Sequence, residues 1–277
     1  MNDLPLRLIT ALVLGLVVIS GIYYSDLTFG IILLIIGYFS STEYLKLALH
    51  GAEINNPVLM VRLAASGSIL PLILYLILSN VFIDHSLVYS LIGSLFFSSL
   101  IFLYLLTQNV MGDWRYYQAY SMALIYIGFP LLLFYWVCNY QGSYQMWKPL
   151  TLLILIWCND IMAYFTGRLI GKRPLYKEIS PKKTFEGLLG GLLFTILGAL
   201  AISLYLHYLN PIQWVIYGFL VSILATGGDL FESMIKRRYG VKDSGTSLPG
   251  HGGFLDRFDA FIFLLPASSL IIFLFWK

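Results

Sequence analysis

Nine apolar runs, each close to the length of a membrane-spanning helix, divide this chain of 277 residues. A helix that crosses the hydrocarbon core of a bilayer needs about 20 consecutive apolar residues. Backbone N–H and C=O groups in lipid must pair within their own segment, so the runs are expected to be helices. They lie near residues 7–25, 28–46, 61–80, 86–107, 117–138, 149–170, 187–208, 212–231 and 256–276.

The composition agrees with a membrane location. Charged residues make up 11% of the chain and hydrophobic residues 59%, whereas a soluble domain carries about 25% charged residues. The ten-residue alternation that is typical of barrel strands does not recur. Cys138 and Cys158 lie in or beside apolar runs without metal-ligand spacing, and they are expected only to pack. We therefore expect an all-α, polytopic integral membrane helical bundle with about nine transmembrane helices.

The distribution of Lys and Arg predicts the orientation, because cytoplasmic loops carry an excess of these residues. With nine spans and a cytoplasmic N-terminus, all 17 basic residues except Lys148 and Lys277 fall on the cytoplasmic side. The run that follows Arg7 resembles a signal peptide, but no small-residue cleavage site follows it, so it is expected to remain as an anchor. The C-terminus is expected outside.

Polar residues are distributed unevenly along the chain. Residues 1–148 have short polar loops and no convergent acids, and we predict that they form a scaffold of transmembrane helices. Residues 149–277 contain two long cytoplasmic loops, about 171–186 and 232–255, and loops of that length are often functional. We predict one membrane domain, in which residues 149–277 form the catalytic region.

A carboxylate inside an apolar run is the first candidate for chemistry. Asp160 lies about ten residues into its run, where a charge is costly and usually faces a polar cavity. At helical spacing it shares a face with Tyr164, Gly167 and Gly171, and the glycines would let another backbone approach closely. The alternative is a carboxyl group that is hydrogen-bonded between helices for packing alone.

The loop after this run concentrates positive charge. Its basic residues are Arg168, Lys172, Arg173, Lys177, Lys182 and Lys183, and it ends in Ser180-Pro181-Lys182-Lys183-Thr184. These charges either hold the loop in the cytoplasm and touch anionic lipid head groups, or bind the phosphates of a nucleotide or a lipid. The loop alone does not separate these two interpretations.

The segment that joins the last two predicted helices brings acids to one membrane depth. Asp229 lies at the cytoplasmic end of one apolar run, with Glu232 and Ser233 one turn on. Asp256 and Asp259, at i and i+3, begin the next run. Hard divalent cations such as Mg²⁺ take carboxylate oxygens together with substrate phosphates. The competing interpretation is a salt-bridged loop that seals the bundle.

The same segment carries basic residues that are suited to balancing phosphate charge: Lys236, Arg237, Arg238, Lys242 and Arg257. Around His251, the glycines Gly250, Gly252 and Gly253 would let the backbone approach a ligand closely. Acids, bases and glycines together predict metal-assisted phosphoryl-group chemistry.

These residues also carry a family resemblance. Residues 233–259, SMIKRRYGVKDSGTSLPGHGGFLDRFD, resemble the signature of the phosphatidate cytidylyltransferases, also called CDP-diacylglycerol synthases. The matching positions are Ser233, Lys236, Arg237, Lys242, Asp243, Pro249, His251, Gly252, Gly253, Asp256, Arg257 and Asp259. Upstream, SPKKTFEG resembles the family's SPKKT-x-EG element, with Phe185 where a Trp is expected. The resemblance covers about residues 150–260.

The resemblance implies transfer of CMP from CTP to phosphatidic acid with Mg²⁺, giving CDP-diacylglycerol and pyrophosphate. Asp229, Asp256 and Asp259 are then the predicted metal ligands, and a second metal ion is left open. The predicted catalytic residues also include Asp243, Lys242, Arg257, Asp160 and His251. The predicted substrate-binding residues are Ser180, Lys182, Lys183, Thr184, Lys236, Arg237, Ser233 and Arg168.

The expected partners follow from the same resemblance. CTP and phosphatidic acid are the substrates, the lipid bilayer is the environment, and no nucleic acid is expected to bind. The resemblance also suggests a homodimer that uses the N-terminal helices. The expected location is the inner (plasma) membrane of a bacterium, with the active site facing the cytoplasm.

Other classes of function compete with this one. A CDP-alcohol phosphotransferase should carry DG-x2-AR followed by G-x3-D-x3-D, and no such run is present. A polyprenyl-phosphate glycosyltransferase is the other lipid-phosphate transferase to consider. A transporter would use Asp160 and a basic cavity for ion passage, but the acids and bases cluster on one face, with nothing complementary outside.

Overall fold

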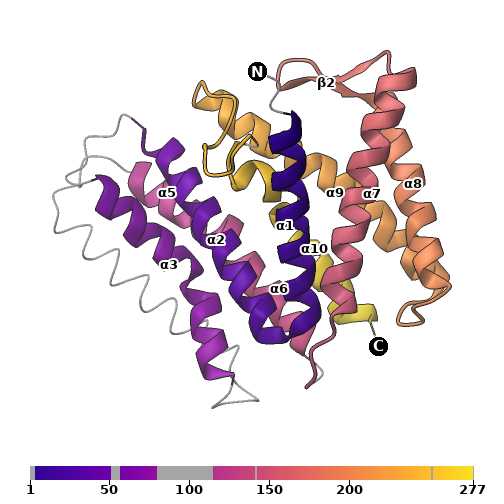
Figure 1. Ribbon diagram of the computed structural model, residues 1–277, viewed down its shortest axis with the longest axis horizontal. Coiled ribbons are helices and arrows are strands. Elements are labelled where there is room, and N and C mark those ends of the chain that lie inside the picture. The colour runs from indigo at the N-terminus through magenta and orange to yellow at the C-terminus, as the bar shows by residue number, and fades with distance from the viewer. Residues whose placement is uncertain (1–3, 51–56, 80–114, 141, 251, 277) are drawn as a thin grey trace. The chain divides into compact units, whose positions relative to one another are not determined.

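Helices dominate the structure, a computed structural model that describes residues 4–50, 57–79, 115–140, 142–250 and 252–276 (Figure 1). Seven described helices are long and apolar enough to cross a membrane. They are Asp26–Ala48, Val58–Leu78, Arg115–Asn139, Trp147–Ile170, Phe185–Ser203, Pro211–Arg238 and Leu255–Phe275. The expectation of a polytopic helical membrane protein is therefore confirmed.

The other two predicted spans differ from these seven. The first apolar run forms α1 (Leu4–Tyr24). Its apolar part, Leu8–Tyr24, is shorter than each of the seven helices that are long enough to cross a membrane. The predicted run 86–107 lies outside the described residues. The total of nine spans thus stays a prediction.

Contacts between Cα atoms divide the chain into two compact units. Unit 1 comprises Met1–Asn139 and Tyr239–Phe258, and unit 2 comprises Tyr140–Arg238 and Asp259–Lys277. Most of the family-like segment after α9 therefore packs with helices from the distant N-terminal half. The helix α10 (Leu255–Phe275) begins in unit 1 and continues in unit 2.

Unit 1 is built around α2. Its helices are α1 (Leu4–Tyr24), α2 (Asp26–Ala48), α3 (Pro57–Leu78), α5 (Arg115–Ala123), the π-helix η2 (Leu124–Gly128) and α6 (Phe129–Asn139). Phe29 of α2 packs against Phe134 and Tyr135 of α6, with ring centroids 6.2 and 6.0 Å apart. A hydrogen bond of 2.8 Å from the Ser68 hydroxyl to the Ser41 hydroxyl joins α3 to α2. Aromatic packing thus holds α6 against α2, and a buried polar contact holds α3 against it.

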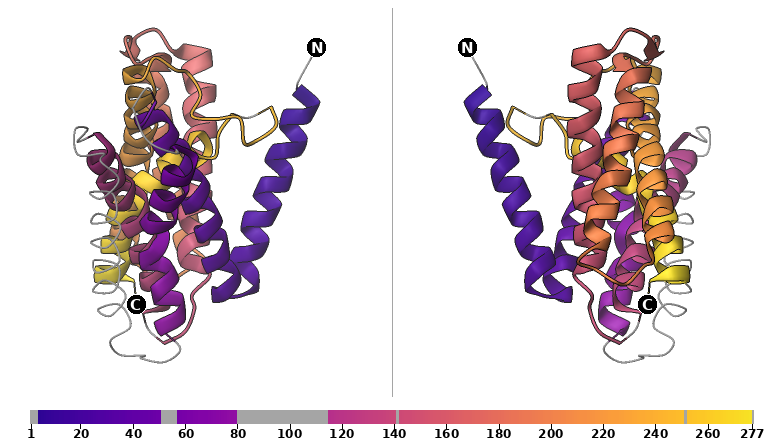
Figure 2. Two further views of the ribbon diagram at one scale, coloured as in Figure 1. Left: turned by 90° about the vertical axis from the view of Figure 1, so that its left-hand side faces the viewer. Right: turned by 90° about the vertical axis from the view of Figure 1, so that its right-hand side faces the viewer.

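The boundary between α1 and α2 has a local cause. Ser25 and Thr28 form a capping box, in which the Thr28 N–H donates to the Ser25 hydroxyl at 3.1 Å and the Ser25 N–H donates to the Thr28 hydroxyl at 3.0 Å. A box of this kind satisfies backbone donors that a helix start leaves unpaired. α1 leans away from α2 beyond this turn (Figure 2).

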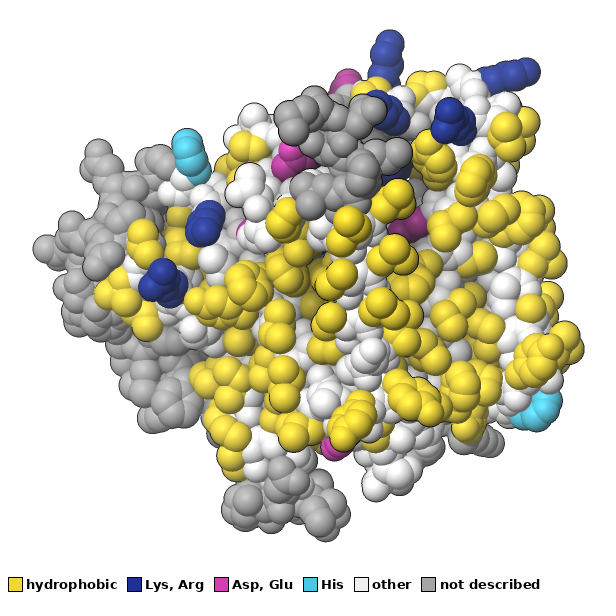
Figure 3. Space-filling view, viewed as in Figure 1, with side chains coloured by type: hydrophobic (Ala, Val, Ile, Leu, Met, Phe, Trp, Pro, Cys, Tyr) yellow, Lys and Arg dark blue, Asp and Glu magenta, His cyan; other side chains and the backbone are white. Residues whose placement is uncertain are grey.

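Unit 2 contains a row of three long helices. α8 (Phe185–Ser203) lies between α7 (Trp147–Ile170) and α9 (Pro211–Arg238), as Figures 1 and 2 show. Hydrophobic side chains cover the lengths of α7 and α8 in Figure 3, and basic side chains gather at one end of these helices. This distribution suits helices that face lipid along their length and water at that end.

Glycines bring α7 and α8 into close contact. A Cβ atom on Gly187 would lie 2.8 Å from the Ala163 carbonyl oxygen, and one on Gly190 would lie 2.2 Å from the Thr166 hydroxyl oxygen. Small residues at a helix interface let the two backbones approach in a membrane. The close packing of α7 against α8 therefore requires residues without a side chain at positions 187 and 190.

A β-hairpin that the sequence does not predict joins α7 to α8. β1 (Pro174–Tyr176) pairs antiparallel with β2 (Ser180–Thr184). Both strands are edges, where proline is tolerated. β2 leads directly into α8, whose N-cap Thr184 accepts the Gly187 N–H at 3.1 Å. The hairpin thereby holds the SPKKT run at the start of a helix.

Candidate functional site

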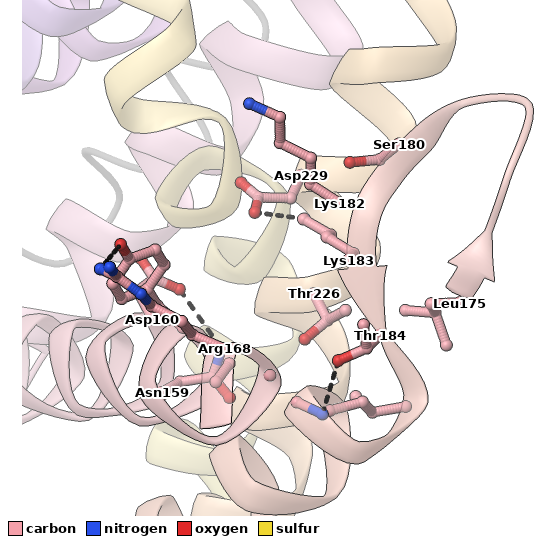
Figure 4. A pocket seen from close by; sticks show the side chains of 15 residues that line it. Asn159, Asp160, Arg168, Leu175, Ser180, Lys182, Lys183, Thr184, Thr226 and Asp229 are labelled. Carbon is pink, nitrogen blue, oxygen red and sulfur yellow. Dashed lines mark hydrogen bonds and ion pairs between the residues drawn. The ribbon is translucent and has the colours of Figure 1, made fainter. Parts of the chain in front are cut away.

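A cavity of about 430 Å³ lies in unit 2, where α7, the hairpin, α8 and α9 meet (Figure 4). Its described lining includes these predicted site residues: Asp160, Arg168, Ser180, Lys182, Lys183, Thr184 and Asp229. The basic loop and two acids from separate helices therefore come together around one space. Asn159, Tyr164 and Thr226 also line it.

One face of α7 forms a wall of this cavity. Asp160, Tyr164 and Arg168 follow one another at intervals of four residues, so their side chains lie on the same side of the helix. Nη1 of Arg168 donates to the Tyr164 hydroxyl at 3.0 Å. The tyrosine thus positions the guanidinium group beside the cavity.

The close backbone approach expected at Gly167 is confirmed, because a Cβ atom there would lie 3.5 Å from the Gly187 Cα of α8. At Gly171 the neighbouring atoms across the interface belong to the Thr184 side chain. A Cβ atom on Gly167 would lie 2.9 Å from the Thr184 hydroxyl oxygen, and one on Gly171 would lie 2.7 Å from the same atom. The neighbour is therefore the N-cap residue of α8. The two glycines let the SPKKT run lie against α7.

A buried amide supports the acid at the inner end of the cavity. The Ser222 hydroxyl of α9 donates to Oδ1 of Asn159 at 2.6 Å, and Nδ2 of Asn159 donates to Oδ1 of Asp160 at 3.3 Å. Asn159 is buried. It was not identified as a site residue from the sequence. The rule that selected Asp160, a polar residue inside an apolar run, would have found it.

An ion pair links the hairpin to α9. Nζ of Lys183 contacts Oδ2 of Asp229, and the dashed line in Figure 4 marks this pair. The side chains are 28% and 36% exposed, so both remain accessible from the cavity. Lys182, the next residue, is exposed and also lines the cavity.

α9 and α10 cross at Gly228. A Cβ atom on Gly228 would lie 3.0 Å from the Ala260 Cα and 2.8 Å from the Phe263 Cβ. Asp229 follows this glycine and Asp259 precedes Ala260, so the crossing brings both acids to one place. Asp259 is buried, and its Oδ1 accepts the Ala260 N–H at 2.7 Å.

The last turns of α9 carry a salt bridge between neighbours on the helix. Nζ of Lys236 lies 2.5 Å from Oε2 of Glu232, whose side chain is 1% exposed. Lys236 therefore compensates a buried carboxylate. Ser233, Lys236 and Arg237 are absent from the described lining of the cavity.

Asp256 lies in unit 1, at the first turn of α10. Its carboxylate accepts the Ser244 N–H at 3.1 and 3.0 Å and the Gly253 N–H at 2.8 Å. Three predicted residues that are near Asp256 in the sequence are exposed to solvent: Lys242, Asp243 and Arg257. His251 lies outside the described residues. Asp256 thus ties together two parts of the loop that precedes α10.

Glu43 of α2 is the acid that the sequence analysis missed. It is 3% exposed and accepts four hydrogen bonds. Oε1 accepts the Ser247 hydroxyl at 2.6 Å and the Phe254 N–H at 3.0 Å, and Oε2 accepts the Ser244 hydroxyl at 2.9 Å and the Leu255 N–H at 2.9 Å. The sequence signal that could have identified Glu43 is a carboxylate inside the apolar run 28–46.

Two glycines of this loop serve the contact with Glu43. A Cβ atom on Gly253 would lie 2.2 Å from Oε2 of Glu43, and one on Gly245 would lie 2.7 Å from Oε1. The space that the missing Cβ of Gly253 leaves is therefore occupied by a buried side chain, and the backbone approach to a ligand at this glycine stays a prediction. Gly250 and Gly252 have φ of 75° and 84°, which L side chains rarely adopt.

The carboxylates of the described residues can be matched to the ligands that Mg²⁺ needs. Within the described part of the chain, no group of three or more His, Cys, Asp or Glu side chains could hold a metal ion. Mg²⁺ is usually bound by one or two carboxylates plus substrate phosphates and water. Asp229 and Asp259, two carboxylates at one helix crossing, fit that requirement.

Comparison with known proteins gives a consistent result. The model of the cytidylyltransferase family matches residues 5–275. Proteins named phosphatidate cytidylyltransferase match from Staphylococcus aureus (strain COL), with 38% identity over 153 residues, and Staphylococcus epidermidis (strain ATCC 12228), with 39% over 152. Each match covers 54% of this chain and 57% of the relative, so the chain spans little more than half the length of these relatives.

Proposed function

Because this chain belongs to the cytidylyltransferase family, we propose that it transfers CMP from CTP to phosphatidic acid, forming CDP-diacylglycerol and pyrophosphate. The named relatives support this reaction. The observation that carries the proposal is the cavity in which Lys182, Lys183 and Asp229 meet at one end of α7, α8 and α9. Such a site suits two anionic substrates, one of which is a lipid.

The reaction requires charge control more than a covalent nucleophile. A phosphate oxygen of phosphatidic acid attacks the α-phosphorus of CTP, and the bond from that phosphorus to the bridging oxygen breaks as pyrophosphate leaves. Both reactants are anions, so catalysis depends on positioning and on stabilising negative charge. The lipid phosphate is already ionised near neutral pH, so no general base is needed to activate it.

We assign the phosphate contacts to the basic residues of the cavity. Lys182 and Lys183 lie on β2 beside Asp229, and Arg168 faces the cavity from α7. Ser180 and Thr184, at the two ends of β2, are assigned to the nucleotide. Charge-assisted hydrogen bonds of this kind are roughly twice as strong as neutral ones.

Asp229 and Asp259 would hold Mg²⁺, which supplies charge stabilisation for the transferred phosphoryl group. In this proposal Lys183 keeps the Asp229 carboxylate compensated until the substrate enters. Asp256, one turn before Asp259 on α10, remains a predicted ligand, and a second metal ion remains a prediction. Asp160, supported by Asn159, is assigned to orienting a cation or a base inside the cavity.

The other predicted residues keep their proposed roles. Lys242, Asp243, Arg257 and His251 are proposed at the reacting groups, and Ser233, Lys236 and Arg237 at the substrates. We further propose nine spans, residues 1–148 as scaffold and 149–277 as the catalytic region. A homodimer in a bacterial plasma membrane, with its active site in the cytoplasm, completes the proposal.

The activity can be tested with purified protein in detergent. Radiolabelled CTP, phosphatidic acid and Mg²⁺ should give labelled CDP-diacylglycerol and pyrophosphate in equal amounts. Omitting phosphatidic acid or adding EDTA should abolish both products. A folded, monodisperse preparation that forms neither product would refute the proposed reaction.

The orientation can be tested without activity. In a variant without Cys138 and Cys158, a membrane-impermeant thiol reagent is applied to intact cells carrying Lys177→Cys or His207→Cys. Both positions are exposed. The proposal expects labelling of the 207 variant from outside and of the 177 variant only after permeabilisation. The reverse pattern would contradict the orientation.

A further inference from the structure

We propose that Glu43 is a positioning residue for the reaction, because its carboxylate fixes the loop between α9 and α10 and thereby the orientation of Asp256. The inference rests on the proposed function. It places a functional residue in α2, within the half of the chain that the sequence indicates is scaffold.

The number of contacts is the first argument. An ionised carboxylate offers about four acceptor positions, and four donors occupy Glu43 at 2.6 to 3.0 Å. The donors belong to both ends of one loop: the hydroxyls of Ser244 and Ser247 on one side and the N–H groups of Phe254 and Leu255 on the other. A single side chain therefore closes the loop.

The location of these donors is the second argument. Leu255 is the first residue of α10, and the N-terminus of a helix favours a negative charge through its free N–H groups. Asp256 follows immediately and accepts the N–H groups of Ser244 and Gly253. Ser244 thus contacts both acids, through its hydroxyl to Glu43 and its N–H to Asp256.

The third argument is that hydrogen-bond donors, and no described cation, compensate the Glu43 carboxylate. Glu43 is 3% exposed, and no described basic side chain forms an ion pair with it. A buried carboxylate without a cation is costly unless donors surround it. Gly245 and Gly253 provide the space for the approach. Loop, glycines and acid therefore form one hydrogen-bonded cluster.

The geometry also says what loss of Glu43 would do. In Glu43→Gln one oxygen becomes an NH₂ group, which cannot accept the N–H that it would face. Phe254 or Leu255 would then lose its partner, and the start of α10 would be free to shift. Asp256 would move with it, because the two residues are adjacent on the first turn. The cavity of unit 2 involves none of these contacts.

The test combines hydrogen exchange with steady-state kinetics on the full-length protein in detergent. The variants are Glu43→Gln, Glu43→Ala and Ser247→Ala, and Glu178→Gln is the control, since Glu178 is exposed on the hairpin loop. Exchange is followed by mass spectrometry in peptides covering residues 242–256 and, as an internal reference, in peptides from α8.

The expected result is selective. Loss of hydrogen bonds to a charged group should speed exchange of the 242–256 peptides about tenfold to a hundredfold, with α8 unchanged. The kcat for CMP transfer should fall by about the same factor in Glu43→Gln, while the KM for CTP stays within about twofold, because the assigned nucleotide contacts lie on the hairpin. Ser247→Ala, which removes one of four bonds, should show a smaller effect in the same direction.

Three results would overturn the inference. The first is unchanged exchange of residues 242–256 in Glu43→Ala. The second is equal acceleration in α8, which would indicate general destabilisation. The third is faster loop exchange with an unchanged kcat, which would leave Glu43 a purely structural residue. If the unmodified protein transfers no CMP, the proposed function fails by itself, and the exchange data still decide whether Glu43 holds the loop.

Discussion

In unit 2 the carboxylate of Asp229 contacts the partly exposed ammonium group of Lys183. In unit 1 the carboxylate of Glu43 accepts two backbone N–H groups and two serine hydroxyls. The pair Lys183–Asp229 is partly exposed, and an exposed ion pair contributes only about 0–1 kcal/mol. Glu43 is buried among four donors, and leaving such donors unpaired costs about 1–3 kcal/mol each.

The difference indicates that a carboxylate side chain can be held in two ways in this fold. A weakly held charge beside a cavity can turn to a ligand at little cost, so it suits substrate and metal binding. A strongly held charge that accepts several hydrogen bonds from a loop fixes the backbone conformation of that loop. The number and kind of donors around an acid therefore indicate which of the two it does.

The largest expected effect tests the accessible acid. Asp229→Asn keeps the size and removes the charge that we assign to Mg²⁺, so turnover should fall about a thousandfold, which corresponds to about 4 kcal/mol of transition-state stabilisation. Turnover is measured as labelled CDP-diacylglycerol over a Mg²⁺ titration, with Glu178→Gln as the control. Near-normal turnover at ordinary Mg²⁺ would remove Asp229 from the metal site and end the comparison with Glu43.

A smaller effect tests the lysine of the same pair. Lys183→Ala should reduce kcat/KM for CTP about tenfold to a hundredfold, because it removes a charge-assisted hydrogen bond to phosphate. Lys177→Ala is the matched control, since Lys177 is exposed on the hairpin loop and absent from the described cavity lining. Equal, small losses in both variants would mean that the positive charge of the hairpin serves orientation alone.

An effect on stability rather than on turnover tests the packed acid through its glycine. Gly253→Ala would place a Cβ atom 2.2 Å from Oε2 of Glu43 and 2.1 Å from the Ser244 hydroxyl oxygen, so it should lower stability by about 1–3 kcal/mol. In Gly198→Ala the new atom would meet its nearest neighbour at 3.6 Å, and the change should be neutral or stabilising. Thermal unfolding in detergent compares the two. Equal stabilities would show that Glu43 can move away.

The sequence predicted the helical class, and it singled out seven residues that line the cavity, for a definable reason. Membrane helices can be recognised by the length and apolarity of their segments. Asp160 and Asp229 are conspicuous because acidic residues are rare in such segments. The basic run of residues 180–184 has a fixed distance to α8 through its N-cap Thr184, so its position follows from local structure. Local signals of this kind need no knowledge of tertiary contacts.

The contacts of Glu43 could not be predicted in the same way. They join α2 to a loop 201 to 212 residues further along the chain, and nothing in either segment specifies the other. Gly253 was assigned to a ligand because the sequence gives the missing Cβ but not what fills the space. The hairpin of residues 174–184 was missed for a related reason, since two prolines and several lysines hide its short strands.

The length of α9 relates the thickness of the bilayer to the proposed site. Its 28 residues extend over about 42 Å at about 1.5 Å per residue, against a hydrocarbon core of about 30 Å. The stretch from Pro211 to Gly228 covers about 27 Å of that length, so a helix whose Pro211 end lies at one edge of the hydrocarbon would place Asp229 at the other edge. A thicker membrane would draw this acid and its lysine into lipid and raise the cost of keeping them charged. Membrane thickness, and with it the acyl chains of the surrounding lipids, should thus set how readily the site works.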